Sequence, residues 1–256
     1  MKSPIKIVRA LWGEPSYLKK EVTHPPLFDN EIVFVWGIDN YTVLVSMGYE
    51  CILVSEFKYN MEYSHYYKHF IHKLFALDIA CTLYDEFLFL DWDVSIVKDI
   101  DDIFWNKIRT GNSIQCPIYS YHEEDKYGFF NRFNPNTILF KFIDKLFNTL
   151  ETQSWKFGDY SCIPNFCFLY VRNNKKLGKK LIDITLSENI ITCIEEFALY
   201  KYVNCDMDTY IEKYEPIVIS GHDKPLYIKN ISTSELTINE YVNTKIGKDI
   251  YLIHEQ

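Results

Sequence analysis

The stretch FLFLDWDVSIV at residues 87–97 is the starting point for the fold class. Its apolar run is typical of a buried strand, yet it ends at the two aspartates Asp91 and Asp93 before apolar residues resume. A charge that leaves water without a partner costs far more free energy than its packing returns. Side chains at positions i and i+2 of an extended chain share a face, so Asp91 and Asp93 point the same way. Their mutual repulsion favours a bound cation. The alternative is a turn whose aspartates cap the next helix.

Short apolar runs and amphipathic segments alternate on both sides of this stretch. We predict strands at residues 5–12, 31–36, 51–55, 87–90, 113–117, 165–171, 216–220 and 249–254, and helices at residues 66–84, 100–107, 139–150 and 187–202. Strands separated by helices predict an α/β fold with a mainly parallel central sheet flanked by helices. Ligands of such sheets bind beyond the carboxyl ends of the strands, and Asp91 and Asp93 lie at such an end.

The composition favours one domain spanning residues 1–256. A chain of 256 residues with 48% hydrophobic residues buries a substantial core, and no proline-, glycine- and serine-rich linker divides it. The net charge of −8 gives no general attraction to nucleic acid or anionic membranes. No run approaches the roughly 20 apolar residues that span a bilayer, so we expect no transmembrane segment. The seven cysteines, odd in number and mostly in apolar runs, favour reduced thiols and a cytoplasmic location.

The acidic pair is suited to a hard divalent cation. Carboxylate oxygens are ligands for Mg²⁺ or Mn²⁺, which complete their shells with water and substrate phosphates. The same three-residue pattern recurs at residues 99–101 and 206–208, where we expect solvated positions. Only the pair at Asp91 and Asp93 follows an apolar strand that comes after three earlier ones.

Residues 72–105, HKLFALDIACTLYDEFLFLDWDVSIVKDIDDIFW, resemble the donor-binding core of nucleotide-sugar glycosyltransferases with the GT-A fold, which is Rossmann-like. In that family a helix with a basic residue leads into an apolar strand that ends in Asp-x-Asp. The resemblance implies that Asp93 coordinates Mn²⁺ or Mg²⁺ and that Asp91 reaches the metal or the donor ribose. It also implies that Lys73 faces the diphosphate or an acidic partner. A solvated helix lysine is the alternative for Lys73.

Two further segments are similar to glycogenin-like members of that family. IPNFCFLYVRN, at residues 163–173, resembles the strand that presents an asparagine to the donor sugar and nominates Asn165, although a phenylalanine and a cysteine follow where small residues are usual. CIEEFALYKY, at residues 193–202, resembles the segment beside the anomeric carbon. It nominates Glu195 and Glu196 for sugar binding or catalysis, with a solvated helix start as the alternative. An inverting enzyme needs a carboxylate base, for which Glu195, Glu196 and Asp159 are candidates.

The resemblance also implies a histidine ligand near the carboxyl terminus, and two candidates remain open. DIYLIHEQ, at residues 249–256, delivers His254 from an apolar strand and is favoured. PIVISGHDKPLY, at residues 216–227, resembles the glycogenin-like H-x-x-G-x-x-K-P-W stretch, but Val218 stands at the histidine position. His222 replaces it only if the turn is shifted.

Tryptophans end the first two predicted strands, where enzymes with this fold bind the nucleotide base. Trp12 and Trp36 are candidates to stack on the base, with Asp39 near the ribose. Core packing is the competing interpretation for each tryptophan.

The resemblance thus implies a metal-dependent glycosyltransferase that moves a sugar from a nucleoside diphosphate donor, with a UDP-sugar favoured, to an acceptor hydroxyl. The acceptor is open among a glycan, a lipid, a protein and a modified nucleobase. A haloacid-dehalogenase-like phosphatase also carries D-x-D-x-[TV] after an apolar strand. That strand normally comes first in the chain, however, and the downstream acidic motif of that family is missing here. A non-catalytic carbohydrate-binding protein is the third hypothesis.

Overall fold

The structure is a computed structural model that describes a large part of the chain. The described residues are 1–13, 22, 24–55, 71–92, 94–96, 100–110, 113–116, 118–120, 162–164, 166–187, 195, 198–199, 202, 211–213, 218–220 and 252–254. The helix predicted at residues 139–150 lies outside them, as do residues 66–70 and most of the helix predicted at residues 187–202.

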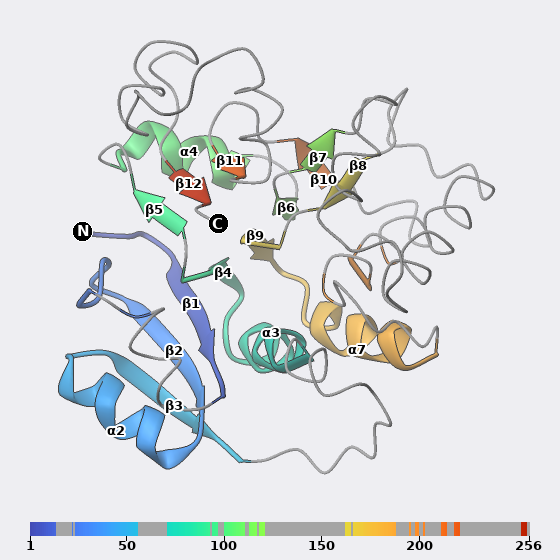
Figure 1. The fold of residues 1–256 in the computed structure, drawn as a ribbon. Helices are drawn as coiled ribbons and strands as arrows, with labels where there is room; N and C mark the ends of the chain where they lie inside the picture. Colours follow the sequence, from blue (N-terminus) through green and yellow to red (C-terminus); the bar gives the residue numbers. More distant parts are fainter. Residues whose placement is uncertain are drawn as a thin grey trace, which may run out of the picture.

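Seven of the described strands form a central sheet in the order β10-β6-β9-β4-β1-β2-β3 (Figure 1). Their bounds are β1 Lys6–Leu11, β2 Glu31–Trp36, β3 Glu50–Val54, β4 Glu86–Leu90, β6 Ile114–Cys116, β9 Phe168–Arg172 and β10 Ile211–Lys213. Strand β9 is antiparallel to both of its neighbours, and the other pairs are parallel. The prediction of an α/β fold with a mainly parallel central sheet flanked by helices is confirmed.

Helices cover both faces of this sheet. Helices α3 (Ile71–Leu83) and α7 (Leu177–Ser187) lie side by side against one face (Figure 1). Helix α2 (Ile38–Ser46) packs on the opposite face beside β2 and β3, and α4 (Asp102–Thr110) covers that face beside β4 and β9. In the described part of the chain, no helix has the length and apolar character needed to cross a membrane.

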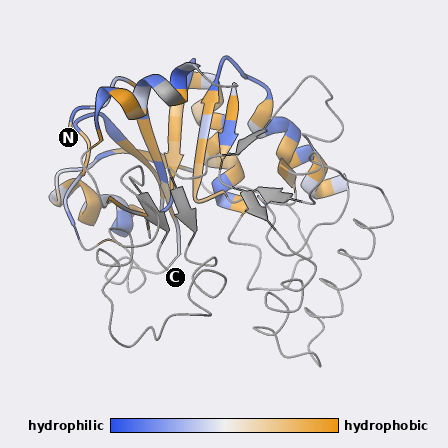
Figure 2. Cartoon of the chain, turned by 90° about the horizontal axis from the view of Figure 1, so that it is seen from above, coloured by the Kyte–Doolittle hydropathy of each residue, from blue (hydrophilic) through white to orange (hydrophobic). Residues whose placement is uncertain are grey.

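Burial on both faces explains why the first strands read as continuous apolar runs. Along β1, Val8 and Ala10 belong to the core on the α3 side, whereas Ile7 and Leu11 belong to the opposite side. Figure 2 accordingly shows the central strands coloured largely as hydrophobic. Arg9 interrupts this pattern, because it is charged and yet fully buried.

Two small sheets accompany the central one. Strand β12 (Leu252–His254) pairs in parallel with β11 (Val218–Ser220) and antiparallel with β5 (Val94–Ile96). Strands β7 (Ile118–Ser120) and β8 (Cys162–Pro164) form an antiparallel pair. The β12–β5 pairing brings a segment from the end of the sequence beside the strand that follows the acidic pair.

Candidate active site

Asp91 lies at the carboxyl end of β4 and is held by three groups from elsewhere in the chain. Its Oδ2 atom accepts a hydrogen bond from Lys73 Nζ at 2.7 Å. Its backbone N–H donates to the carbonyl oxygen of Cys167 at 2.9 Å, and its own carbonyl accepts a hydrogen bond from Arg9 Nη1. The position of Asp91 is therefore fixed through both its side chain and its backbone.

Lys73 joins Asp91 to a second carboxylate. From the first turn of α3 its ammonium also donates to Glu195 Oε1 at 3.2 Å. All three side chains are largely buried, at 11%, 15% and 7% exposure for Lys73, Asp91 and Glu195. Burial raises the pKa of Glu195, and the Lys73 charge opposes that rise. With both carboxylates ionised the cluster carries a net charge of −1, which a cation bound nearby would offset.

Glu195 has unused hydrogen-bonding capacity. Its Oε2 atom is buried and accepts no hydrogen bond from the part of the chain that the structure describes. A buried carboxylate oxygen without a donor is costly, so such an atom suggests a ligand or a further side chain that supplies one.

The register of β12 against β5 relates two of the predicted metal ligands, His254 and Asp93. His254 stands opposite Val94, and Val94 directly follows Asp93. The Asp93 residue and the His254 side chain are themselves outside the described residues, and so is His222. Within the described residues, no group of three or more histidine, cysteine, aspartate or glutamate side chains forms a metal site. The assignments of Asp93, Asp91, His254 and His222 as metal ligands stay predictions.

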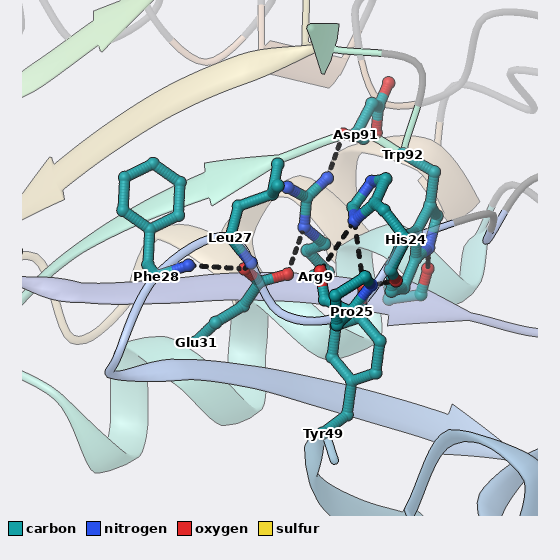
Figure 3. Close-up of polar contacts among 10 residues, drawn as sticks. Arg9, His24, Pro25, Leu27, Phe28, Glu31, Tyr49, Asp91 and Trp92 are labelled. Atoms are coloured by element: carbon teal, nitrogen blue, oxygen red, sulfur yellow. Dashed lines mark hydrogen bonds and ion pairs between the residues drawn. The ribbon is translucent and has the colours of Figure 1, made fainter. Parts of the chain in front are cut away.

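A buried ion pair lies next to the residues that follow β4, Asp91 and Trp92, which lead to Asp93 and which we name the acidic turn (Figure 3). Arg9 Nε donates to Glu31 Oε1 at 2.6 Å, and both side chains are fully excluded from solvent. The Arg9 guanidinium also lies over the Trp92 ring, 4.9 Å from its centroid. Trp92 Nε1 in turn donates to the Ala10 carbonyl at 2.8 Å. No sequence motif predicted this group, although the charged Arg9 within the apolar strand KIVRAL was an available signal.

The two tryptophans at the ends of β1 and β2 meet at a third ring. His72 stacks on Trp12 with 5.6 Å between ring centroids and lies edge-on to Trp36 at 4.8 Å. Trp36 is buried in the core, Trp12 is partly buried and Asp39 is exposed. The core-packing interpretation therefore describes Trp36 well, whereas Trp12 borders the carboxyl edge of the sheet. Base stacking by either ring stays a prediction.

Of the predicted site residues, the structure brings Asp91, Lys73 and Glu195 together. The prediction that Lys73 faces an acidic partner agrees with its two contacts. Asn165, Asp159 and Glu196 lie outside the described residues, and their predicted roles are untested.

Comparison with solved structures places this arrangement among known folds. The chain is similar to a crystal structure of an active-site mutant of LgtC, a glycosyltransferase, at a TM-score of 0.54 and 13% sequence identity. The match covers 98% of this chain and 87% of that one. The chain has the GT-A fold. The GT-A fold that the resemblance of residues 72–105 implied is confirmed.

Two other solved structures that match this GT-A chain are also glycosyltransferases. One is the enzyme involved in glycosylation of the major capsid of PBCV-1, at 13% identity, a TM-score of 0.47 and coverage of 98% and 92% of the two chains. The other is mouse xyloside xylosyltransferase 1 in its apo form, at 7% identity, a TM-score of 0.49 and coverage of 100% and 98%. No model of a known protein family matches the sequence, and no curated protein matches it.

Ligands of open α/β sheets bind beyond the carboxyl ends of the strands, and Asp91 lies at that edge. The metal ligands predicted from the sequence, two carboxylates and one imidazole, suit Mn²⁺ or Mg²⁺. Divalent metals are common in this fold. With both carboxylates ionised, the Asp91–Lys73–Glu195 cluster is negative and fits the approach of a cation to this edge.

Proposed function

We propose that the chain is a metal-dependent glycosyltransferase that moves a sugar from a nucleoside diphosphate donor, with a UDP-sugar as the favoured donor, to an acceptor hydroxyl. The proposal rests chiefly on one observation. The carboxyl end of β4 in a GT-A sheet presents Asp91, ion-paired to Lys73, at the edge where the next residues carry a second aspartate. The acceptor class stays open among a glycan, a lipid, a protein and a modified nucleobase.

Mn²⁺ or Mg²⁺ is the proposed cofactor, bound by Asp93 with Asp91 and a histidine, His254 or His222. The ion supplies Lewis-acid stabilisation of the negative charge on the diphosphate leaving group. The register of His254 beside Val94 supports His254 over His222 as the third ligand. Trp12 or Trp36, Asp39 and Asn165 are the proposed contacts to the base, ribose and sugar.

Glu195 is the proposed carboxylate beside the sugar. Its contact to Lys73 ties it to Asp91, and its second oxygen is directed at no hydrogen-bond donor among the described residues. A sugar hydroxyl is a suitable donor for that oxygen. Glu196 and Asp159 remain alternative carboxylates for catalysis.

The test is donor turnover by the purified chain. We expect UDP-sugar hydrolysis or transfer with Mn²⁺, its loss on addition of EDTA, and its loss in Asp93→Asn, which keeps the size of the side chain and removes its charge. A panel of nucleotide sugars is assayed by release of the nucleoside diphosphate. Metal-dependent hydrolysis of p-nitrophenyl phosphate without UDP-sugar turnover would support the phosphatase alternative instead. Carbohydrate binding without turnover of either compound would support the non-catalytic one.

We further propose that the protein works in the cytoplasm. Cys51 and Cys81 are free thiols, and the Cys81 thiol is buried. Burial raises the pKa of the Cys81 thiol to about 12, which keeps it protonated and unreactive. Unpaired thiols of this kind suit a reducing compartment.

A further inference from the structure

We infer that Arg9 is a positioning residue that sets the backbone geometry of the acidic turn, and through it the affinity of the site for a divalent cation. The inference rests on the proposed metal-dependent function. The group concerned consists of Arg9, Glu31, Trp92 and the backbone carbonyl of Asp91, and we name it the Arg9 clamp. It lies beneath the turn on the face of the sheet opposite α3 (Figure 3).

The clamp holds the turn from below through three contacts. Arg9 Nη1 donates to the Asp91 carbonyl, and its guanidinium supports the Trp92 ring from 4.9 Å. The Trp92 indole is also tied to β1, because its N–H donates to the Ala10 carbonyl at 2.8 Å. Lys73 holds the Asp91 carboxylate on the other side. The residue before Asp93 is thus fixed in position as well as Asp91.

The Arg9 clamp is in turn held by hydrogen bonds and packing contacts with neighbouring residues. Glu31 Oε1 accepts from Arg9, while Glu31 Oε2 accepts from the backbone N–H groups of Leu27 and Phe28 at 3.0 and 3.3 Å. Tyr49 packs edge-on against Trp92, with 5.6 Å between the ring centroids. The Tyr49 hydroxyl donates to the His24 carbonyl at 2.7 Å. Motion of the turn therefore requires several buried contacts to break together.

The chemistry of these contacts requires arginine. A guanidinium offers donors in a fixed planar fork and stacks on an aromatic face, so one side chain reaches a carboxylate, a carbonyl and an indole at once. A lysine ammonium keeps the charge opposite Glu31 but cannot reproduce this fork or the stacking. The substitution Arg9→Lys therefore separates pairing with Glu31 from support of the turn.

Stability alone gives little reason for such a pair in the core. Replacing a buried ion pair by apolar side chains of similar volume is often neutral or stabilising, because two charges no longer have to leave water. Arg9 and Glu31 have no exposed side-chain surface, so the full desolvation cost falls on this pair. Arg9 does make one contact that an apolar residue cannot make. It donates a hydrogen bond to the Asp91 carbonyl, beside the proposed metal ligands.

The experiment measures Mn²⁺ binding by calorimetry with wild type, Asp93→Asn, Arg9→Lys and Arg109→Lys. Arg109 is the matched control, since its Nε pairs with Glu86 Oε1 at 3.0 Å at the opposite end of β4. We expect Arg9→Lys to weaken Mn²⁺ binding by about 10–100-fold, the range found when groups behind a metal ligand are removed. We expect Arg109→Lys to bind as wild type does.

Backbone hydrogen exchange over residues 88–96, measured without metal, gives a second readout, and we expect faster exchange in Arg9→Lys. If Arg9→Lys misfolds, Arg9→Met with Glu31→Gln replaces it, because the pair is then neutral and the amide oxygen still accepts from Leu27 and Phe28. Wild-type Mn²⁺ affinity and wild-type exchange in a folded Arg9 variant would overturn the inference and leave the proposed function standing. Equal Mn²⁺ binding by wild type and Asp93→Asn would instead overturn the proposed metal role, and this inference with it.

Discussion

At the scale of single residues, the candidate site is a balance of buried charges around Lys73. The Lys73 ammonium pairs with two carboxylates. Asp91 directly follows β4, and Glu195 lies in a helical segment far along the chain. A buried charge is tolerated only when it is paired, so removal of the shared partner leaves two carboxylates that repel each other. The consequence depends on pH, because protonation of one carboxyl relieves that repulsion.

We predict that Lys73→Met lowers the free energy of unfolding at pH 8 by roughly 3–5 kcal/mol, the cost typical of breaking a buried pair. The pKa of Glu195, already raised by burial, rises further without Lys73. A carboxyl group with a raised pKa binds its proton more tightly in the folded state than in the unfolded chain. The free energy of unfolding of the variant therefore falls as pH rises, and it recovers as pH is lowered towards the pKa of that group in the unfolded chain. Urea unfolding at pH 5 and pH 8 measures this difference.

Lys175→Met is the control for this prediction. Lys175 pairs with Asp85 at 2.7 Å, but both side chains are substantially exposed, at 48% and 78%. Exposed pairs contribute about 0–1 kcal/mol, so little change is expected at either pH. Equal losses at pH 5 and pH 8 in Lys73→Met would show that the repulsion between Asp91 and Glu195 is not the cause.

The roles of single residues could be predicted where a motif is short and local. Asp91 was identified from its place after an apolar strand, and an acidic partner for Lys73 came from the family resemblance. The Arg9 clamp was not predicted, because its members come from positions 9, 31 and 91–92 and no local pattern links them. Pairings between separate strands require the register of the sheet.

At the scale of elements, the position of α3 depends on its crossing with α7. A Cβ atom added at Gly178 would lie 2.3 Å from Asp78 Cα and 2.4 Å from Asp78 N. These are backbone atoms of α3, which a side-chain rotation cannot move. Glycine therefore permits the two helices to approach closely, and α3 carries Lys73.

We predict that Gly178→Ala lowers the free energy of unfolding by about 1–3 kcal/mol, as overpacking of a tight interior does. Helix propensity alone predicts the opposite sign, a gain of roughly 0.5–1 kcal/mol for alanine over glycine. The sign measured by chemical denaturation thus separates the two effects. Lys179→Ala, at an exposed position of the same helix, serves as the control. A stabilised Gly178→Ala would contradict the close crossing.

Elements with a strong sequence pattern were predicted well. Strands β1 to β4 begin and end within one residue of the predicted bounds, because each is a nearly continuous run of apolar residues in the sequence. Helix α2 was missed, since IDNYTVLVS contains several β-branched residues that favour strands. Helix α7 was missed because its first residues belong to a basic run interrupted by glycine. Strands β5, β7, β8 and β10 have only three residues each, too few to show a period.

At the scale of the whole molecule, the acidic turn is bordered by strands from two distant parts of the sequence. Strand β5 follows the turn directly, and β12 pairs with it in the register that sets His254 opposite Val94. His254 is the favoured histidine ligand because it lies at the end of a predicted apolar strand. The pairing of β12 with β5 agrees with that geometry, while the contact of the imidazole with an ion stays a prediction.

We predict that His254→Ala raises the Mn²⁺ concentration needed for half-maximal donor turnover by about 10–100-fold. The reason is the loss of one of the ligands proposed for the ion. His222→Ala is measured in parallel and should leave the Mn²⁺ dependence unchanged. The reverse result would move the ligand assignment to His222, and no effect of either substitution would leave a site of carboxylates and water.

The wide sequence separation of the Lys73 contacts has a consequence for how the chain folds. Lys73 lies 18 positions from Asp91 and 122 positions from Glu195. Closing the longer loop from an unfolded chain costs about 1.7 kcal/mol more conformational entropy, because the cost grows as (3/2)RT ln n. The link from α3 to β4 can thus form early, whereas Glu195 joins only after a much larger part of the chain has condensed. We therefore expect Lys73 and Asp91 to meet first during refolding, and the complete Asp91–Lys73–Glu195 cluster to form only when the segment that carries Glu195 has joined.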